Sequence, residues 1–204
     1  IKELNKGSFS SELYFRNTNN IRERIQEVYD TNVIIKRPVN AGTSKALGLE
    51  LAFNKKLKKW WSLDAGANLF YYSVVGQISG SSLDQESFTY RGRLSNSFNL
   101  PKDWRIQFVA NYESDIVSVQ GIQKGFTTFD LSIKKSFLER RLSATLQFRN
   151  VFGTQVRENW VDTETLYSYR LATPKWPVLN LALSWRLNNF NQKDKIRTEK
   201  GEEF

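Results

Sequence analysis

The sequence predicts an all-β fold, an antiparallel up-and-down β-barrel that crosses a membrane with its strands. Three observations predict it: apolar and polar residues alternate along most of the chain, short and long connections alternate, and aromatic residues gather near the ends of the alternating segments. Successive side chains of a strand point to opposite faces, so this alternation gives each strand one apolar and one polar face. No apolar run approaches the roughly 18–20 residues that a transmembrane helix requires.

The alternation divides the chain into about eight strands. The first runs from Phe9 through Phe15 and continues, with gaps, toward Tyr29, although residues 21–29 also fit helical spacing. The second is a long return over residues 33–53, with a bulge or irregularity at residues 40–42. Six clearer strands follow, over residues 61–72, 88–100, 104–113, 128–137, 142–149 and 179–187.

The connections between these strands alternate in length. Those over residues 54–59, 101–103 and 138–141 are short and charged, whereas those over 73–87, 113–125 and 153–175 are longer. Tight turns at one end and long loops at the other are typical of outer-membrane barrels, whose short turns face the periplasm. An immunoglobulin-type sandwich has shorter strands and less regular pairing, and a lipocalin-like soluble barrel turns its apolar face inward.

The polar face of the strands carries side chains that are too long and too charged for a dry core. Burying several unpaired guanidinium groups costs many kcal/mol, whereas a watery lumen leaves them solvated. The polar face is therefore predicted to line a lumen. The predicted lumen-facing residues are Asp64, Asn68, Arg91, Arg93, Arg105, Gln107, Gln147, Arg149 and Arg186.

The apolar face is correspondingly predicted to contact lipid. In the six clear strands no cation occupies a central position of this parity, and Lys135 lies near a strand end, where it can snorkel. The predicted lipid-facing residues are Leu63, Leu69, Leu94, Phe98, Ile106, Phe108, Leu131, Ile133, Leu146, Phe148, Leu181 and Leu183. The prediction is contradicted if Leu181, Leu183, Phe108 and Leu146 pack together in an enclosed dry centre.

Aromatic residues near both ends of the strands predict two girdles. Amphipathic rings are favoured at the headgroup level of a bilayer, so two aromatic bands mark the two membrane interfaces. The predicted girdle residues at the short-turn end are Trp61, Trp104 and Phe137. Those at the loop end are Tyr71, Tyr90, Tyr112 and Phe152.

The composition argues against several classes of function. The chain has no Cys and no His, so it cannot build a disulfide framework, a thiolate nucleophile or a Ser-His-Asp triad, and it lacks the usual zinc ligand. The formal charge of +9 lies largely at turns and in the tail, and aromatic and cationic residues mostly take opposite parity, which argues against nucleic-acid binding. The loop carboxylates Glu113, Asp115, Asp162 and Glu164 are interpreted as solvated acids. We expect no enzymatic activity, no cofactor and no nucleic-acid partner.

Four segments, in this order, carry a resemblance to a known family: ALGLELAFNKKLKKWWSLDAGANLFYY (46–72), YRGRLSNSFNLPKDWRIQFVANY (90–112), FDLSIKKSFLERRLSATLQFRNVFGT (129–154) and LNLALSWRL (179–187). They resemble the C-terminal barrel of TonB-dependent outer-membrane receptors, and among these the outer membrane protein β-barrel family. The resemblance implies a full barrel of about 22 strands, with a plug and a TonB-contacting segment outside this chain. Residues 1–190 would then be about the last eight strands, and residues 191–204 a charged, disordered periplasmic tail.

The resemblance also implies a function and partners. It implies import of a ligand across the cell outer membrane, with outer-membrane lipid, the barrel-assembly machinery and, through a segment outside this chain, the TonB complex as partners. The last strand of such receptors serves as the assembly signal, and the residues of this chain that match it are Leu181, Leu183, Trp185, Leu187 and Phe190.

Three other functions stay open at this point: a complete eight-stranded barrel with a packed lumen, a non-transporting scaffold or client barrel in a larger complex, and a soluble β-protein. The transported ligand is not identified by the sequence. Aromatic loop residues are interpreted as an extension of the outer girdle rather than as a cargo-stacking surface; they are Trp160, Tyr167, Tyr169 and Trp176.

Overall fold

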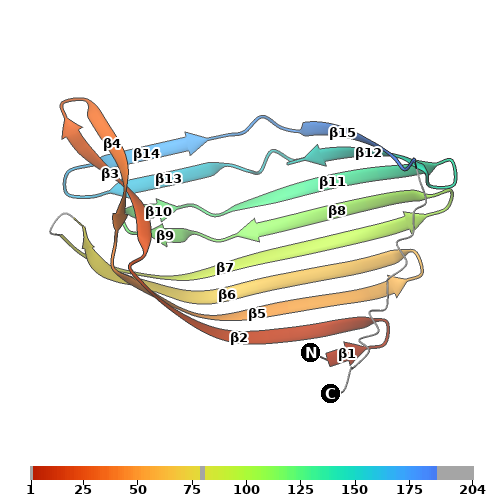
Figure 1. The fold of residues 1–204 in the computed structure, drawn as a ribbon, viewed down its shortest axis with the longest axis horizontal. Helices are drawn as coiled ribbons and strands as arrows, with labels where there is room; N and C mark the ends of the chain where they lie inside the picture. Colours follow the sequence, from red (N-terminus) through yellow and green to blue (C-terminus); the bar gives the residue numbers. More distant parts are fainter. Residues whose placement is uncertain (1, 79–80, 188–204) are drawn as a thin grey trace, which may run out of the picture.

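A computed structural model describes residues 2–78 and 81–187, and all regular structure in these residues is β-strand (Figure 1). The largest sheet has nine strands in the order β1-β2-β5-β6-β7-β8-β11-β12-β15, and every pair is antiparallel. Its strands are β1 (Lys2–Leu4), β2 (Gly7–Asn19), β5 (Thr43–Lys58), β6 (Trp61–Ile78), β7 (Ser81–Leu100), β8 (Trp104–Glu113), β11 (Phe126–Phe137), β12 (Leu142–Arg149) and β15 (Val178–Trp185). The predicted all-β, antiparallel fold is confirmed, and β1 is the one strand of this sheet that adds to the predicted eight.

The short turns of the large sheet lie at one of its ends, and two smaller sheets lie at the other end (Figure 1). One is the hairpin of β3 (Arg22–Asp30) and β4 (Val33–Asn40). The other has four strands in the order β14-β13-β10-β9, namely β9 (Ile116–Ser118), β10 (Gly121–Gln123), β13 (Arg157–Asp162) and β14 (Tyr167–Ala172). We call this end of the molecule the loop end and the opposite one the turn end.

The nine-stranded sheet is open. Within the described residues, β15 and the β1–β2 side each lack a further strand to pair with. The expected closed barrel of about 22 strands is therefore not present in residues 2–78 and 81–187. The predicted tail at 191–204 and Phe190 lie outside the described residues.

The first two predicted strands are each divided in two, which corrects their continuity, although the second is interrupted at the irregularity predicted for residues 40–42. The strands are interrupted at Asn20 and again at residues 41–42. At these positions Asn20 (φ 58°) and Gly42 (φ 105°) turn the backbone out of the strand conformation. Hydrogen bonds from the Ile21 N–H to the Gly42 carbonyl (3.0 Å) and from the Ala41 N–H to the Ile21 carbonyl (2.9 Å) join the two breaks. The β3–β4 hairpin therefore leaves the large sheet as one unit, and residues 22–30 form a strand rather than a helix.

The three predicted long loops contain strands, which is a second correction. β6 continues to Ile78 and β7 begins at Ser81, while residues 113–125 and 153–175 contribute the four-stranded sheet. These segments lack strict alternation, but main-chain hydrogen bonds form a ladder whatever the side-chain pattern. At the strand ends, β5 extends to Lys58 and β15 stops at Trp185 rather than Leu187.

The predicted turn at residues 54–59 is shortened to the two residues between β5 and β6. The other two predicted short turns are confirmed at residues 101–103 and 138–141. Left-handed backbone conformations close them, with φ of 60° at Lys102 and 59° at Asp103 in the first and 50° to 68° from Leu138 to Arg140 in the second. Among residues 2–78 and 81–187 there is no helix long and apolar enough to cross a membrane.

Among the described residues, the cluster of buried apolar side chains lies at the loop end. A cluster of Ile25, Ala41, Val74 and Val119 joins the hairpin, the large sheet and the β9–β10 connection. This cluster holds the two smaller sheets against the large one and therefore positions the loop end. In the described residues, most of the large sheet has no packed layer on its apolar face.

Candidate functional site

The register of the large sheet brings the apolar residues of neighbouring strands onto one face, which we call the apolar face. Leu131 of β11 lies between Phe108 of β8 and Phe148 of β12. In the next row of the same face, Ile133 lies between Ile106 and Leu146. The pairing extends this face across the sheet through the other predicted lipid-facing residues, which are Leu63, Leu69, Leu94, Phe98, Leu181 and Leu183.

Many large side chains of the apolar face are exposed. On the edge strand β15, Leu181, Leu183 and Trp185 are 68%, 70% and 66% exposed. Soluble proteins rarely expose contiguous apolar patches of more than a few hundred Å². In the described residues, Leu181 and Leu183 do not join Phe108 and Leu146 in an enclosed core.

The opposite face, which we call the polar face, carries a row of charged and amide side chains. The row crosses five adjacent strands in register, from Glu12 through Glu50, Asn68 and Arg91 to Glu113. Arg91 Nε lies 2.8 Å from Glu113 Oε1, and Asn68 Nδ2 donates to Glu50 Oε1 at 3.0 Å. Each contact is between neighbouring strands, so the row forms a polar network across the sheet.

Small residues open a hollow beside this charged row. The neighbouring row of the polar face contains Ser10, Ala52 and Gly66, and next to them Arg93 donates to Asn111 at 3.2 Å. The resulting hollow has a volume of about 620 Å³. It is open, and its lining combines apolar surface with charges of both signs, so it can hold water or another segment that presents both polar and apolar groups.

The remaining predicted lumen-facing residues follow the polar face toward the turn end. Arg105 Nε donates to Asn99 at 2.8 Å, and Gln107 Nε2 donates to Ser95 at 3.0 Å. Register places three further predicted residues on this face, namely Asp64, Gln147 and Arg149. Arg186 lies after the end of β15, and its N–H donates to the Arg141 carbonyl (2.8 Å).

The chain thus combines antiparallel strands with one exposed apolar face and one charged, hydrogen-bonded face. The sequence model of the outer membrane protein beta-barrel family matches residues 2–185. The chain belongs to this family. No curated protein and no solved structure has a significant match to the chain.

At the turn end of this barrel-family chain, each predicted girdle residue contacts a neighbouring aromatic or cationic side chain. Trp61 stacks on Phe98 with ring centroids 5.9 Å apart. The Lys135 ammonium lies over Trp104 and Phe137, at 5.2 and 5.7 Å from the ring centroids, and donates to the Lys102 carbonyl in the adjacent turn. Lys135 therefore carries its charge past the aromatic rings to the polar end of the strand.

The aromatic residues at the loop end form several separate contacts. The rings of Tyr90 and Tyr112 stack with centroids 5.5 Å apart, and Phe152 meets Phe129 edge-on at 5.1 Å. The Tyr71 hydroxyl donates to Glu86. Among the other loop aromatics, Trp160 contacts Tyr167 and Tyr169, and Trp176 is exposed beside Gly153.

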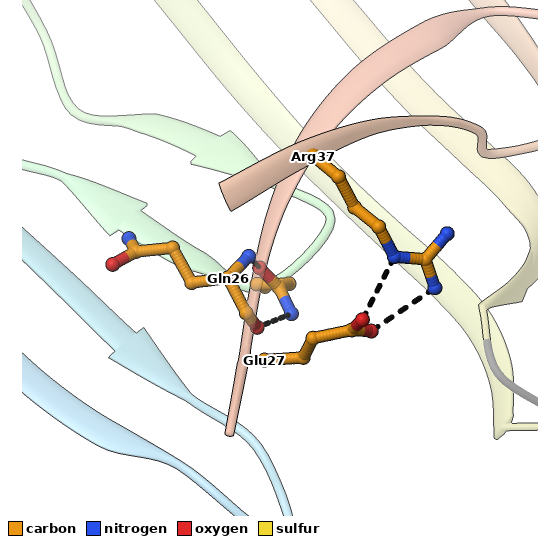
Figure 2. A network of polar contacts seen from close by, with 4 residues as sticks. Gln26, Glu27 and Arg37 are labelled. Atoms are coloured by element: carbon orange, nitrogen blue, oxygen red, sulfur yellow. Dashed lines mark hydrogen bonds and ion pairs between the residues drawn. The ribbon is translucent and has the colours of Figure 1, made fainter. Parts of the chain in front are cut away.

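Two contacts stabilise the β3–β4 hairpin, one to the β9–β10 connection and one between its own strands, and sequence reasoning missed both. The Gln120 side chain accepts from the Gln26 N–H (2.7 Å) and donates to the Gln26 carbonyl (2.9 Å). Figure 2 shows the second contact, in which Arg37 donates to both carboxylate oxygens of Glu27, at 2.8 and 3.1 Å. These hydrogen bonds hold the pKa of Glu27 below its ordinary value.

The charged row and the hairpin contacts carry little signal in the sequence. Glu12 and Glu50 lie 38 positions apart, and Gln26 and Gln120 lie 94 apart, so only the strand register brings them together. In the part of the chain that the structure describes, no group of three or more acidic side chains could hold a metal ion.

Asp115 ties together the β8–β11 connection. Its carboxylate accepts from the Gly125 N–H (2.8 Å) and from Lys124 Nζ (2.7 Å), and these hydrogen bonds hold the pKa of Asp115 below its ordinary value. A group whose pKa is lowered by folding stabilises the fold above its unfolded pKa, about 3.9 for Asp, and loses that contribution as the pH falls toward the lowered value.

We therefore expect amide exchange over residues 113–125 to accelerate, beyond the intrinsic pH effect, as the pH falls below about 4. Hydrogen exchange at a series of pH values measures the exchange rates of these amides. Asp115→Asn removes the titrating group and is expected to flatten this dependence. An unchanged pH profile in the variant contradicts the role given to Asp115.

Proposed function

We propose that this chain is the C-terminal part of the barrel of a TonB-dependent receptor that imports a ligand across the outer membrane. In this proposal the plug and the energy-coupling segment lie outside the chain. The observation that carries it is the contrast between the two faces of an open sheet, one exposed and apolar, the other charged and hydrogen-bonded.

Lipid is the environment that this contrast fits. Acyl chains would cover the exposed leucines of the apolar face, and the aromatic residues at both ends would lie at the two interfaces. Water in a lumen would solvate Arg91, Arg93 and Arg105, which lie on the polar face with Asn, Glu, Gly and Lys as cross-strand partners. The short turns at 101–103 and 138–141 would face the periplasm and the two smaller sheets the cell exterior.

The open edges favour a larger barrel over a complete eight-stranded one. An unpaired strand edge in lipid leaves each unmatched backbone group at a cost of several kcal/mol, so β15 and the β1–β2 side require further strands. The resemblance to TonB-dependent receptors supplies a barrel of about 22 strands, which would provide them. A hydrated lumen of that width has room for the charged row, whereas a barrel of about eight strands is filled by side chains.

The test uses the whole protein that contains this chain, purified in detergent from the outer-membrane fraction. It is expected to exceed the 23.8 kDa of this chain, to shift on heating in gel electrophoresis, and to bind the purified periplasmic domain of the organism's TonB protein. A native polypeptide near 24 kDa contradicts the fragment proposal. A large barrel that does not bind the TonB domain contradicts energised import and favours a scaffold.

A further inference from the structure

A hollow at the loop end lies between the β3–β4 hairpin and the four-stranded sheet, and it has a volume of about 890 Å³. Ligand pockets commonly measure about 300–1,000 Å³. The hairpin contributes Arg24 and Lys36 to its lining, and the four-stranded sheet contributes Gln123, Asn159 and Arg170.

Strand register explains how these side chains come to share one hollow. On the hairpin, Arg24 pairs with Pro38 and Gln26 pairs with Lys36. Arg24 and Lys36 therefore lie on the same face of the hairpin, in successive rows of that face. On the sheet, Asn159 pairs with both Gln123 and Arg170, so these three residues form one row across β10, β13 and β14. The two faces come from segments more than 80 residues apart in the chain.

The charge of this hollow has a single sign. Arg24, Lys36 and Arg170 are the ionisable residues that line it, and all three are exposed cations. None of them takes part in the ion pairs found among the described residues. The acids nearby have other positions: Glu27 is bonded to Arg37, and Glu158 lies on the other face of β13 from Asn159.

The hollow is held in shape by the contacts of the hairpin. The Gln120 amide bonds both main-chain groups of Gln26, as a neighbouring strand would. Ile25 is buried in the cluster with Val74 and Val119. Two independent attachments, one polar and one apolar, therefore fix the wall that carries Arg24 and Lys36 relative to the sheet that carries Arg170.

Other polar groups of the lining include the amides of Gln123 and Asn159 and the hydroxyls of Ser118 and Ser168. Amides both donate and accept, and therefore suit the hydroxyl groups of a sugar, whereas arginine and lysine bind carboxylate or sulfate groups with charge-assisted hydrogen bonds. We propose that this hollow binds an acidic oligosaccharide of a few sugar units. The proposal rests on the proposed function for the orientation of the hollow toward the cell exterior, and it names the class of ligand that would be captured.

Isothermal titration calorimetry on the whole protein in detergent tests this inference. The probes are two acidic sugars, trigalacturonate and a chondroitin sulfate tetrasaccharide, with maltotriose as the neutral sugar and tripolyphosphate as the anion without hydroxyl-rich rings. At least one acidic sugar is expected to bind at least about tenfold more tightly than maltotriose and tripolyphosphate. Failure of both acidic sugars to bind, or equal binding of either comparison compound, overturns the proposal.

Variants locate the binding. The triple variant R24Q/K36Q/R170Q is expected to weaken binding of the acidic sugar at least about tenfold, because it removes all the cations of the lining. The matched control K56Q/K58Q/K59Q removes the same charge from the turn end and is expected to bind as the unmodified protein does. Equal weakening in both variants means non-specific attraction and overturns the site. Binding of the TonB domain is measured on the same samples, so the failure of this inference is distinguishable from the failure of the proposed import function.

Discussion

Leu181→Arg is expected to lower the free energy of unfolding in a phosphatidylcholine bilayer by about 2–4 kcal/mol. Leu181 is in the middle of β15 on the apolar face, opposite Leu146. An arginine near the bilayer midplane must either lose its hydration or distort the lipid around it, which accounts for this magnitude. Denaturant titration of the whole protein refolded into vesicles measures the change.

Asn180→Arg is the matched control for this experiment. Asn180 precedes Leu181 on the same strand, pairs with Gln147 and therefore lies on the polar face. The same arginine there is expected to reach water and to change stability by less than about 1 kcal/mol. Since Leu181 is already 68% exposed, Leu181→Arg would be equally mild in a protein whose apolar face met water. Similar small effects of both substitutions contradict the lipid-facing assignment.

Trp185→Asp is expected to prevent insertion of most of the protein into the outer membrane of cells. Trp185 ends β15, is exposed on the apolar face and pairs with Leu142. We propose that the barrel-assembly machinery reads the apolar row of β15, which comprises Leu181, Leu183 and Trp185, together with Leu187 just after the strand. The heat-modifiable band in the outer-membrane fraction measures the inserted protein.

Trp104→Asp separates the assembly signal from a general effect of an acid at the membrane interface. Trp104 begins β8 at the same end of the sheet and on the same apolar face, and its exposure is also substantial. The Trp104→Asp variant is expected to insert into the outer membrane more fully than the Trp185→Asp variant. A Trp185→Phe variant, which keeps an aromatic ring at this position, is expected to insert as the unmodified protein does. Normal assembly of Trp185→Asp contradicts the role proposed for the last strand.

The parity of the strands could be read from the sequence because it is a local property. Leu131, Ile133 and their neighbours alternate with polar residues, and a strand turns successive side chains to opposite faces whatever it pairs with. The turns at 101–103 and 138–141 were equally readable, since charged residues interrupt the alternation between two strongly apolar strands. The extended segments of the loop end were missed, because residues 73–87 and 153–175 pair through their main chains without a regular side-chain pattern.

The polar site needed information that no single segment contains. Glu50 and Asn68 lie in one row because β5 and β6 pair in one register. A shift of this register by one residue would place the two side chains on opposite faces of the sheet. The hollow between the hairpin and the four-stranded sheet depends on the Gln26–Gln120 contact. Its three cations are unremarkable in a chain with 30 Lys and Arg.

The amino-acid sequence by itself determined that this protein is made of strands with one apolar and one polar face, because alternation acts residue by residue through backbone geometry. The tertiary structure decided which strands are neighbours, where the β3–β4 hairpin leaves the large sheet, and which distant charges meet in one row or one hollow. These features depend on pairing between segments up to 94 residues apart, and the hydrogen bonds that fix such pairing come from main-chain and amide groups that leave little trace in the residue pattern.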